Sequence, residues 1–227
     1  MFKFIDREEE QYIVLVSGWA FDYRVFATLD LPYNYIFFCG ESAVGFEDEL
    51  KKMLDKNGIN KVSLLGWSQG AFMACDFASS NHGIVEEIIL AGTRRKYEKE
   101  GLTNIKRYLV KNRTAYLYKF YRECFCNQEK NYYRWFKDTL LKNYLEGMSL
   151  EQLVEGLDWL EQAKINSDSL KKLKHIKIVH GCADSIAPIE EAVDLSDSLP
   201  QSQLITFDKT GHLPFLQKDF KRRLYEG

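Results

Sequence analysis

The sequence has 227 residues and a net charge of −2 at pH 7, with 45% hydrophobic and 28% charged residues. This length allows one substantial core that carries an insertion, but not two large domains. The longest apolar runs are far shorter than the roughly 20 residues that a membrane span needs, and the acidic N-terminal residues lack the apolar core of a signal peptide. We therefore expect a cytoplasmic protein with no membrane span.

Short apolar segments alternate with helical patterns in the first and last thirds of the chain. Strand-like segments cover 12–17, 35–39, 61–65, 85–91, 176–179 and 203–207. Helical patterns cover 46–57, 69–79, a segment opened by Pro188, and a last helix over about 213–225. Nearly all-apolar strands separated by helices predict an α/β fold, with a mainly parallel sheet covered by helices on both faces.

The middle of the chain, residues 94–168, has a helical pattern without a strand candidate. We predict that it is a helical lid inserted after the fourth parallel strand, and that 1–93 and 169–227 form the core. Between Arg94 and Lys142 there are fourteen Lys or Arg residues and five Asp or Glu residues. Such an excess attracts acidic molecules over about one Debye length, although charge runs are often only solvated surface.

Four basic residues of the predicted lid lie among aromatic residues and are the candidates for binding an acidic partner. They are Arg122, Arg134, Lys137 and Lys142. No motif that reads nucleic acid accompanies them, so we expect no nucleic-acid partner.

The cysteine and histidine patterns do not predict a metal site. The five cysteines are scattered without a C-x-x-C pair, and the four histidines include neither H-x-H nor H-E-x-x-H. We expect reduced thiols, no metal and no cofactor.

The segment GWSQG at 66–70 places Ser68 between two glycines, directly after an apolar strand and at the start of a helix rich in small residues. A bare G-x-S-x-G is weak evidence, but this context is the strand-turn-helix of a nucleophile elbow. The small residues allow a tight turn and close packing of the helix. We predict that Ser68 is a nucleophile.

A serine nucleophile needs a base, and the base needs an acid that fixes its tautomer. Asp184 follows the strand at 176–179, and His212 follows the last strand, which is the chain order that this fold uses. Asp184 could instead cap the helix at Pro188, and Asp208 is a weaker candidate because it shares the loop of His212. The histidine at 180 lies in a strand and is interpreted as structural.

An oxyanion hole requires two backbone N–H groups that point at the developing negative charge. One is expected from Gln69, the residue after the nucleophile, and the other from Trp19 in the loop after the first parallel strand.

Together, GWAFDYRVF, GWSQG, HGCADSIAP and TGHLPF resemble the α/β-hydrolase superfamily and, within it, the pimeloyl-[acyl-carrier protein] methyl ester esterases of biotin synthesis. GLDWLEQAKINSD is similar to a late lid segment of those enzymes. The resemblance implies an α/β-hydrolase fold, a Ser68–His212–Asp184 triad, Trp19 and Gln69 as oxyanion donors, and a basic lid that grips acidic carrier protein. Gln69 departs from the usual pattern, in which an apolar residue stands at this position.

The main hypothesis is a serine carboxylesterase that acts on an acyl-chain ester, with pimeloyl-carrier methyl ester as the specific substrate. A thioesterase or a general small-ester hydrolase could use the same triad. A hydrolase fold without activity, serving as a binding module, is the alternative from a different class.

Overall fold

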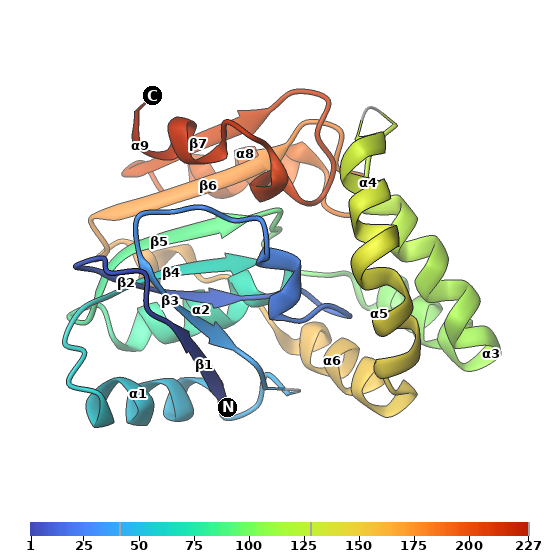
Figure 1. Cartoon of the computed structure of the whole chain (residues 1–227), viewed down its shortest axis with the longest axis horizontal. Helices are drawn as coiled ribbons and strands as arrows, with labels where there is room; N and C mark the ends of the chain where they lie inside the picture. Colours follow the sequence, from blue (N-terminus) through green and yellow to red (C-terminus); the bar gives the residue numbers. More distant parts are fainter. Residues whose placement is uncertain (41, 128, 227) are drawn as a thin grey trace.

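The computed structural model describes residues 1–40, 42–127 and 129–226. Within them, seven strands form one sheet in the order β1-β3-β2-β4-β5-β6-β7 (Figure 1). The strands are β1 (Phe2–Ile5), β2 (Tyr12–Val16), β3 (Asn34–Phe38), β4 (Val62–Trp67), β5 (Val85–Ala91), β6 (His175–Gly181) and β7 (Ser202–Phe207). Neighbouring strands are parallel except for β1 and β3. The predicted mainly parallel α/β sheet is confirmed.

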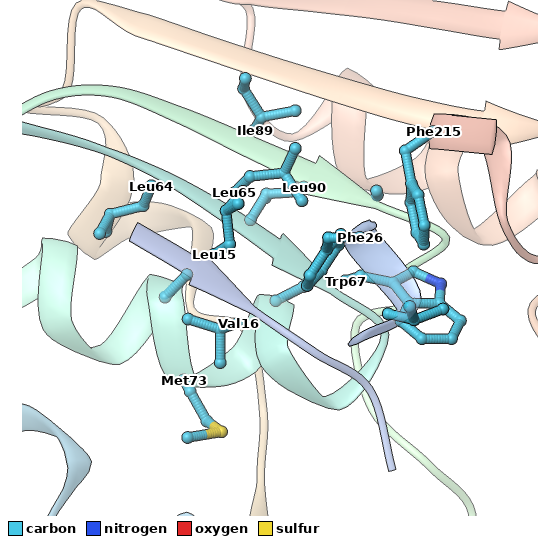
Figure 2. Packing of buried hydrophobic residues seen from close by; sticks show 14 of the residues in the cluster. Leu15, Val16, Phe26, Leu64, Leu65, Trp67, Met73, Ile89, Leu90 and Phe215 are labelled. Carbon is cyan, nitrogen blue, oxygen red and sulfur yellow. The ribbon is translucent and has the colours of Figure 1, made fainter. Parts of the chain in front are cut away.

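The centre of the sheet is buried because its strands are almost entirely apolar. All six residues of β4 are buried, as are the last four of β2 and of β5. Figure 2 shows Leu15, Leu65 and Leu90, from these three strands, packed in one cluster. Burying each such side chain contributes about 1.5–3 kcal/mol, so this central cluster holds the strand ends in place.

The core helices pack directly on the sheet. They are α1 (Phe46–Lys56), α2 (Gln69–Ser80), α8 (Ile189–Asp197) and α9 (Phe220–Tyr225), with a short 3₁₀ turn at Tyr23–Phe26. The helix α2 contacts β2, β4 and β5, and α8 contacts β6 and β7. A Cβ atom at Gly70 would lie 2.2 Å from the carbonyl oxygen of Val16. A glycine at this position therefore lets α2 approach the sheet closely.

Within the described residues, five helices and a π-helical segment lie between β5 and β6. The π-helical segment and the first four helices occupy the region expected to form the lid, which we call the lid below. They are α3 (Lys99–Glu123), α4 (Lys130–Phe136), the π-helical Lys137–Leu141, α5 (Lys142–Gly147) and α6 (Leu150–Gln162). These helices lie beyond the carboxyl ends of the central strands, at the right of Figure 1. The short helix α7 (Ser167–Leu170) leads back to β6. No helix in the described ranges is long and apolar enough to cross a membrane.

Two features differ from the sequence pattern. The strand β1 was not indicated, and it adds an antiparallel edge strand before the parallel ones. The prediction of a single last helix over 213–225 is wrong, because a 3₁₀ turn at Pro214–Leu216 is separated from α9 by an extended Gln217 with φ −68° and ψ 135°. Phe215 packs against the rings of Phe26 and Trp67, and this core packing prevails over the local helical pattern.

Candidate active site

Ser68 lies in the sharp turn between β4 and α2. Its backbone has φ 54° and ψ −115°, which is strained for a residue other than glycine. Its N–H donates to the carbonyl oxygen of Ala91 at 2.9 Å, which attaches the turn to the end of β5. A Cβ atom at Gly66 would lie 2.4 Å from the carbonyl oxygen of Gly70. The two glycines thus allow the tight turn of a nucleophile elbow.

Asp184 and His212 meet between the loops that follow β6 and β7. The Nδ1 atom of His212 lies 2.7 Å from Oδ2 of Asp184, and both side chains are almost completely buried. The other carboxylate oxygen of Asp184 accepts from the backbone N–H groups of Ile186 and Ala187 at 2.8 and 3.0 Å. The alternative in which Asp184 caps the helix is not observed, because α8 begins at Ile189 with Pro188 at its N-cap position and no side-chain cap; Asp184 instead orders the loop before the helix while it pairs with His212.

The contacts of this pair indicate how its protons are arranged. Burial alone would raise the pKa of Asp184, but the charge and hydrogen bond of His212 bring that pKa below its ordinary value. Asp184 is therefore a carboxylate, which can only accept, so Nδ1 of His212 carries the proton. Its Nε2 is buried and has no hydrogen-bond partner among the described residues. The lone pair of this nitrogen is available to accept a proton.

The structure contains no hydrogen bond between Ser68 Oγ and His212 Nε2. Ser68 is nevertheless attached to Ala91, and a Cβ atom on the next residue, Gly92, would lie 3.2 Å from Nδ1 of His212. Serine and histidine thus flank the same strand end. Catalytic hydrogen bonds are often long before substrate binds.

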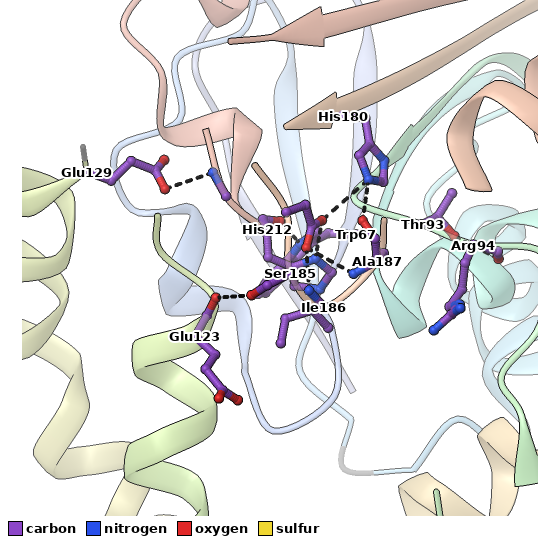
Figure 3. A network of polar contacts seen from close by, with 12 residues as sticks. Trp67, Thr93, Arg94, Glu123, Glu129, His180, Ser185, Ile186, Ala187 and His212 are labelled. Atoms are coloured by element: carbon purple, nitrogen blue, oxygen red, sulfur yellow. Dashed lines mark hydrogen bonds and ion pairs between the residues drawn. The ribbon is translucent and has the colours of Figure 1, made fainter. Parts of the chain in front are cut away.

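A second buried histidine, His180, lies beside the pair. Its Nε2 donates to the carbonyl oxygen of Ala187 at 2.7 Å and lies 3.5 Å from Oδ2 of Asp184 (Figure 3). Burial lowers the pKa of His180 despite the nearby carboxylate. This neutral histidine therefore packs behind Asp184 and limits the movement of its carboxylate.

The loop that carries His212 is attached to the sheet and to the lid. Trp67 donates its indole N–H to the carbonyl oxygen of His212 at 2.7 Å. The backbone N–H of His212 donates in turn to the carbonyl oxygen of Cys124 at 2.8 Å. The N–H of Gly211 donates to the carboxylate of Glu129 at 2.8 Å. The Asp184 loop is attached to the same part of the lid, where Ser185 Oγ donates to the carbonyl oxygen of Glu123 at 3.1 Å (Figure 3).

Trp19 and Gln69, the expected oxyanion donors, lie under lid helix α6. Gln69 is the first residue of α2, where N–H groups have no acceptor within the helix. The backbone N–H of Trp19 makes no hydrogen bond to the described part of the protein. The Trp19 indole donates to Leu153 O at 2.9 Å, and the Gln69 side chain donates to Gly156 O at 3.3 Å. The two side chains hold the lid while their backbone N–H groups remain available.

Two residues near the site were missed by the sequence analysis. Burial raises the pKa of the Tyr97 phenol, and the nearby Ser68 side chain opposes that rise, which indicates that the phenol lies near Ser68. Glu129 is 4% exposed and lies 82 residues from Gly211, to which its carboxylate is bound. Neither residue belongs to a motif, and no local signal in the sequence marks a contact over this separation.

The four basic residues expected to bind a partner are all on the lid surface, away from Ser68. Arg122, Arg134, Lys137 and Lys142 are exposed. The guanidinium of Arg122 lies 5.0 Å from the ring centre of Tyr133. Lys137 and Lys142 border a shallow depression between α3 and α5. Their charges face solvent, where they can act on a large partner, although the ammonium of Lys142 lies 3.9 Å from a carboxylate oxygen of Glu146.

No metal site is built into this region. In 1–40, 42–127 and 129–226, no group of three or more His, Cys, Asp or Glu side chains is placed to hold a metal ion.

Comparison with known proteins agrees with this architecture. Residues 38–219 match the model of a family described as alpha/beta hydrolase fold. The chain is 23% identical to a pimeloyl-[acyl-carrier protein] methyl ester esterase of Vibrio campbellii, over 90% of this chain and 88% of that protein. Its fold is similar to those of an esterase from Exiguobacterium antarcticum (TM-score 0.82, 20% identity, 99% and 93% coverage) and a thermophilic esterase from Thermogutta terrifontis (TM-score 0.83, 20% identity, 98% and 90% coverage).

Proposed function

Because the chain belongs to the α/β-hydrolase fold family and is a serine ester hydrolase, we propose that it cleaves acyl-chain esters through Ser68, His212 and Asp184. The observation that carries this assignment is the buried 2.7 Å contact between Asp184 and His212, which leaves the Nε2 lone pair unpartnered on a histidine that flanks the same strand end as Ser68.

The reaction proceeds through an acyl-enzyme. Ser68 Oγ attacks the ester carbonyl carbon while its proton moves to Nε2 of His212. The bond to the alkoxy group then breaks, and the alkoxy oxygen takes the proton from Nε2 and departs as the alcohol. Water attacks the acyl-enzyme, gives a proton to Nε2, and Ser68 regains that proton as the acid is released. Asp184 keeps the proton of His212 on Nδ1 and stabilises the imidazolium that forms in each half of the reaction.

The backbone N–H groups of Trp19 and Gln69 stabilise the tetrahedral intermediates. Negative charge develops on the former carbonyl oxygen, and donors fixed before the reaction need no reorganisation to accept it. Removing one such donor commonly costs a factor of about 10² to 10³ in kcat. The lid contacts of both side chains hold these two backbone segments in place.

The specific substrate that we propose is the methyl ester of a pimeloyl chain carried on acyl carrier protein. A relative with 23% identity is named for that substrate, and the lid of this chain presents exposed cations suited to an acidic carrier. Arg134 and Lys137 are three positions apart in the sequence, a spacing that places them on neighbouring positions of one helical surface. The uncharged ester end would then enter the cleft at Ser68.

The experiment that tests the ester hydrolase mechanism follows release of p-nitrophenol from p-nitrophenyl butyrate. The wild-type chain should turn over, and Ser68→Ala should lose at least about 10³-fold in kcat. Ser80→Ala is the matched control, because Ser80 is exposed at the opposite end of α2. A fluorophosphonate should label the peptide that contains Ser68. Equal, slow release by wild type and Ser68→Ala would instead support a binding module without activity.

A further inference from the structure

A pocket of about 250 Å³ lies beside the nucleophile, between the core and lid helix α6. Gly18, Trp19 and Gln69 line its inner side, and a Cβ atom at Gly18 would lie 3.0 Å from Cβ of Ser68. Gly156 and Trp159 of α6 line its outer side. A substrate whose carbonyl reaches Ser68 therefore places one of its two ends in this pocket.

The pocket is aromatic and carries negative charge. Its described lining includes two carboxylates, Asp22 and Glu155, and no Lys, Arg or His. Asp22 is paired with the guanidinium of Arg24, with nitrogen–oxygen distances of 2.6 to 3.0 Å. That cation offsets its charge.

Glu155, whose side chain is exposed at the edge of the pocket, has no such ion pair in the described part of the chain. Its carboxylate accepts from the hydroxyl of Ser42 at 2.7 Å, and the described residues provide no cation to pair with it. A hydroxyl donor stabilises the carboxylate without cancelling its charge. The rings of Trp19 and Trp159 add aromatic faces, which attract apolar groups and cations and repel anions.

We infer that this pocket binds an uncharged or cationic end of the ester substrate and disfavours a free carboxylate, with Glu155 as the residue that discriminates. The inference rests on the proposed ester hydrolysis at Ser68 and narrows its substrate class. Diesters, and chains whose far end is masked by a carrier, fit the pocket. The half-acid that remains when such a diester is cleaved once fits it poorly.

The test compares three methyl esters of equal chain length: dimethyl adipate, monomethyl adipate, and an ester that ends in a trimethylammonium group. For wild type, kcat/KM for the carboxylate-ended ester should be lower than for the diester by about fivefold, the scale of repulsion between partly solvated charges a few ångströms apart. The cationic ester should be cleaved at least as well as the diester. With kcat/KM counted per ester group, because the diester has two, Glu155→Gln should bring the ratio close to one, and Glu155→Lys should reverse it.

Glu151→Gln is the matched control, because Glu151 is an exposed carboxylate of α6 outside the pocket lining, and it should leave the ratio unchanged. Equal cleavage of both adipate esters by wild type, or a wild-type ratio in Glu155→Lys, would overturn the inference. Binding of the same esters to the inactive variant Ser68→Ala is measured through the fluorescence of Trp19 and Trp159, and the ratio of their dissociation constants is compared in the same way. An absence of hydrolysis would thus refute the proposed function, while the binding ratio decides the pocket assignment by itself.

Discussion

Glu129 links the base of the lid to the loop of His212, and Glu129→Ala should therefore impair both folding and catalysis. One carboxylate oxygen accepts from the N–H groups of Cys126 and Gly211, both at 2.8 Å. The other accepts from the side-chain amide of Gln217 at 3.0 Å. Alanine removes the acceptor from two backbone N–H groups, of which that of Gly211 is buried.

The size of the effect follows from these contacts. The buried N–H of Gly211, left without its acceptor, costs about 1–3 kcal/mol, so Glu129→Ala should lower the free energy of unfolding by about 1–3 kcal/mol. Since Gly211 precedes His212, release of its N–H should also shift the imidazole. Small displacements of catalytic groups cost up to about 10²-fold, so we expect kcat to fall by at least about tenfold with little change in KM.

The variant Glu129→Gln removes the negative charge of the side chain but keeps an oxygen that can accept hydrogen bonds. Its amide oxygen can still accept from Cys126 and Gly211, so kcat should remain within about threefold of wild type. Burial raises the pKa of Glu129 above its ordinary value of 4.5, although its hydrogen bonds oppose that rise. The folded state therefore binds this proton more tightly, and the resulting stability is lost as pH rises through the raised pKa. Any stability advantage of wild type over Glu129→Gln should therefore shrink between about pH 4 and pH 7.

Urea unfolding at these two pH values and steady-state kinetics on p-nitrophenyl butyrate measure both effects. Glu100→Ala, which removes an exposed carboxylate from the first turn of α3, is the control and should behave as wild type. If Glu129→Ala unfolds at the same urea concentration as wild type with unchanged kcat, the lid base does not hold the histidine loop. If Glu129→Ala raised KM without lowering kcat, the role of Glu129 in positioning His212 would be contradicted.

The remaining predictions concern the lid. A Cβ atom at Gly156 would lie 2.8 Å from Cδ1 of Trp19, so Gly156→Ala should lower kcat/KM for p-nitrophenyl butyrate by about tenfold, even though alanine favours helix by about 1 kcal/mol. Charge reversal at Arg134 and Lys137 should weaken hydrolysis of a carrier-linked ester by about tenfold at low salt, with loss of the effect at high salt. Hydrolysis of a free small ester should be unaffected by the reversal.

Matched variants control both predictions. Gly101→Ala changes a glycine of α3 whose Cβ would meet no atom within 4 Å, and it should raise the melting temperature slightly without changing kcat/KM. Lys52→Glu reverses an exposed charge of α1, and it should leave both substrates unaffected. Equal losses on carrier-linked and free esters in the lid variants would refute carrier binding. Full activity in Gly156→Ala would show that α6 need not remain close to Trp19.

The elements that the sequence predicted well are those with local signals. The strand 85–91 and the helix that begins after Pro188 have the predicted positions, because an apolar run and a proline act within a few residues. The elbow at Ser68 was also readable, since its two glycines and its strand are adjacent in sequence. The 3₁₀ turn at 214–216 was not, because Phe215 is placed by rings that are remote in the chain.

The contacts that hold the candidate triad in place were beyond the reach of sequence patterns. Trp67 and His212 are separated by 145 residues, and Glu129 and Gly211 by 82. The resemblance to a known family named which residues would meet. The family resemblance carried no information on how the base of the lid would hold Asp184 and His212, because Glu129 and Cys124 lie outside the motifs on which the resemblance rests.

The distribution of charge acts separately on the two ends of the proposed substrate. The exposed lid cations are screened over about one Debye length, roughly 8 Å at physiological ionic strength, so they influence only a large anionic carrier that meets the surface. Glu155 is exposed, but it lines a pocket that adjoins Ser68 and would lie within a few ångströms of a bound chain end, a separation shorter than one Debye length, so salt weakens this interaction less. Salt should therefore reduce the preference for a carrier while the preference for an uncharged chain end persists. Since the two sets of residues share no contact, their effects on the free energy of the transition state should add.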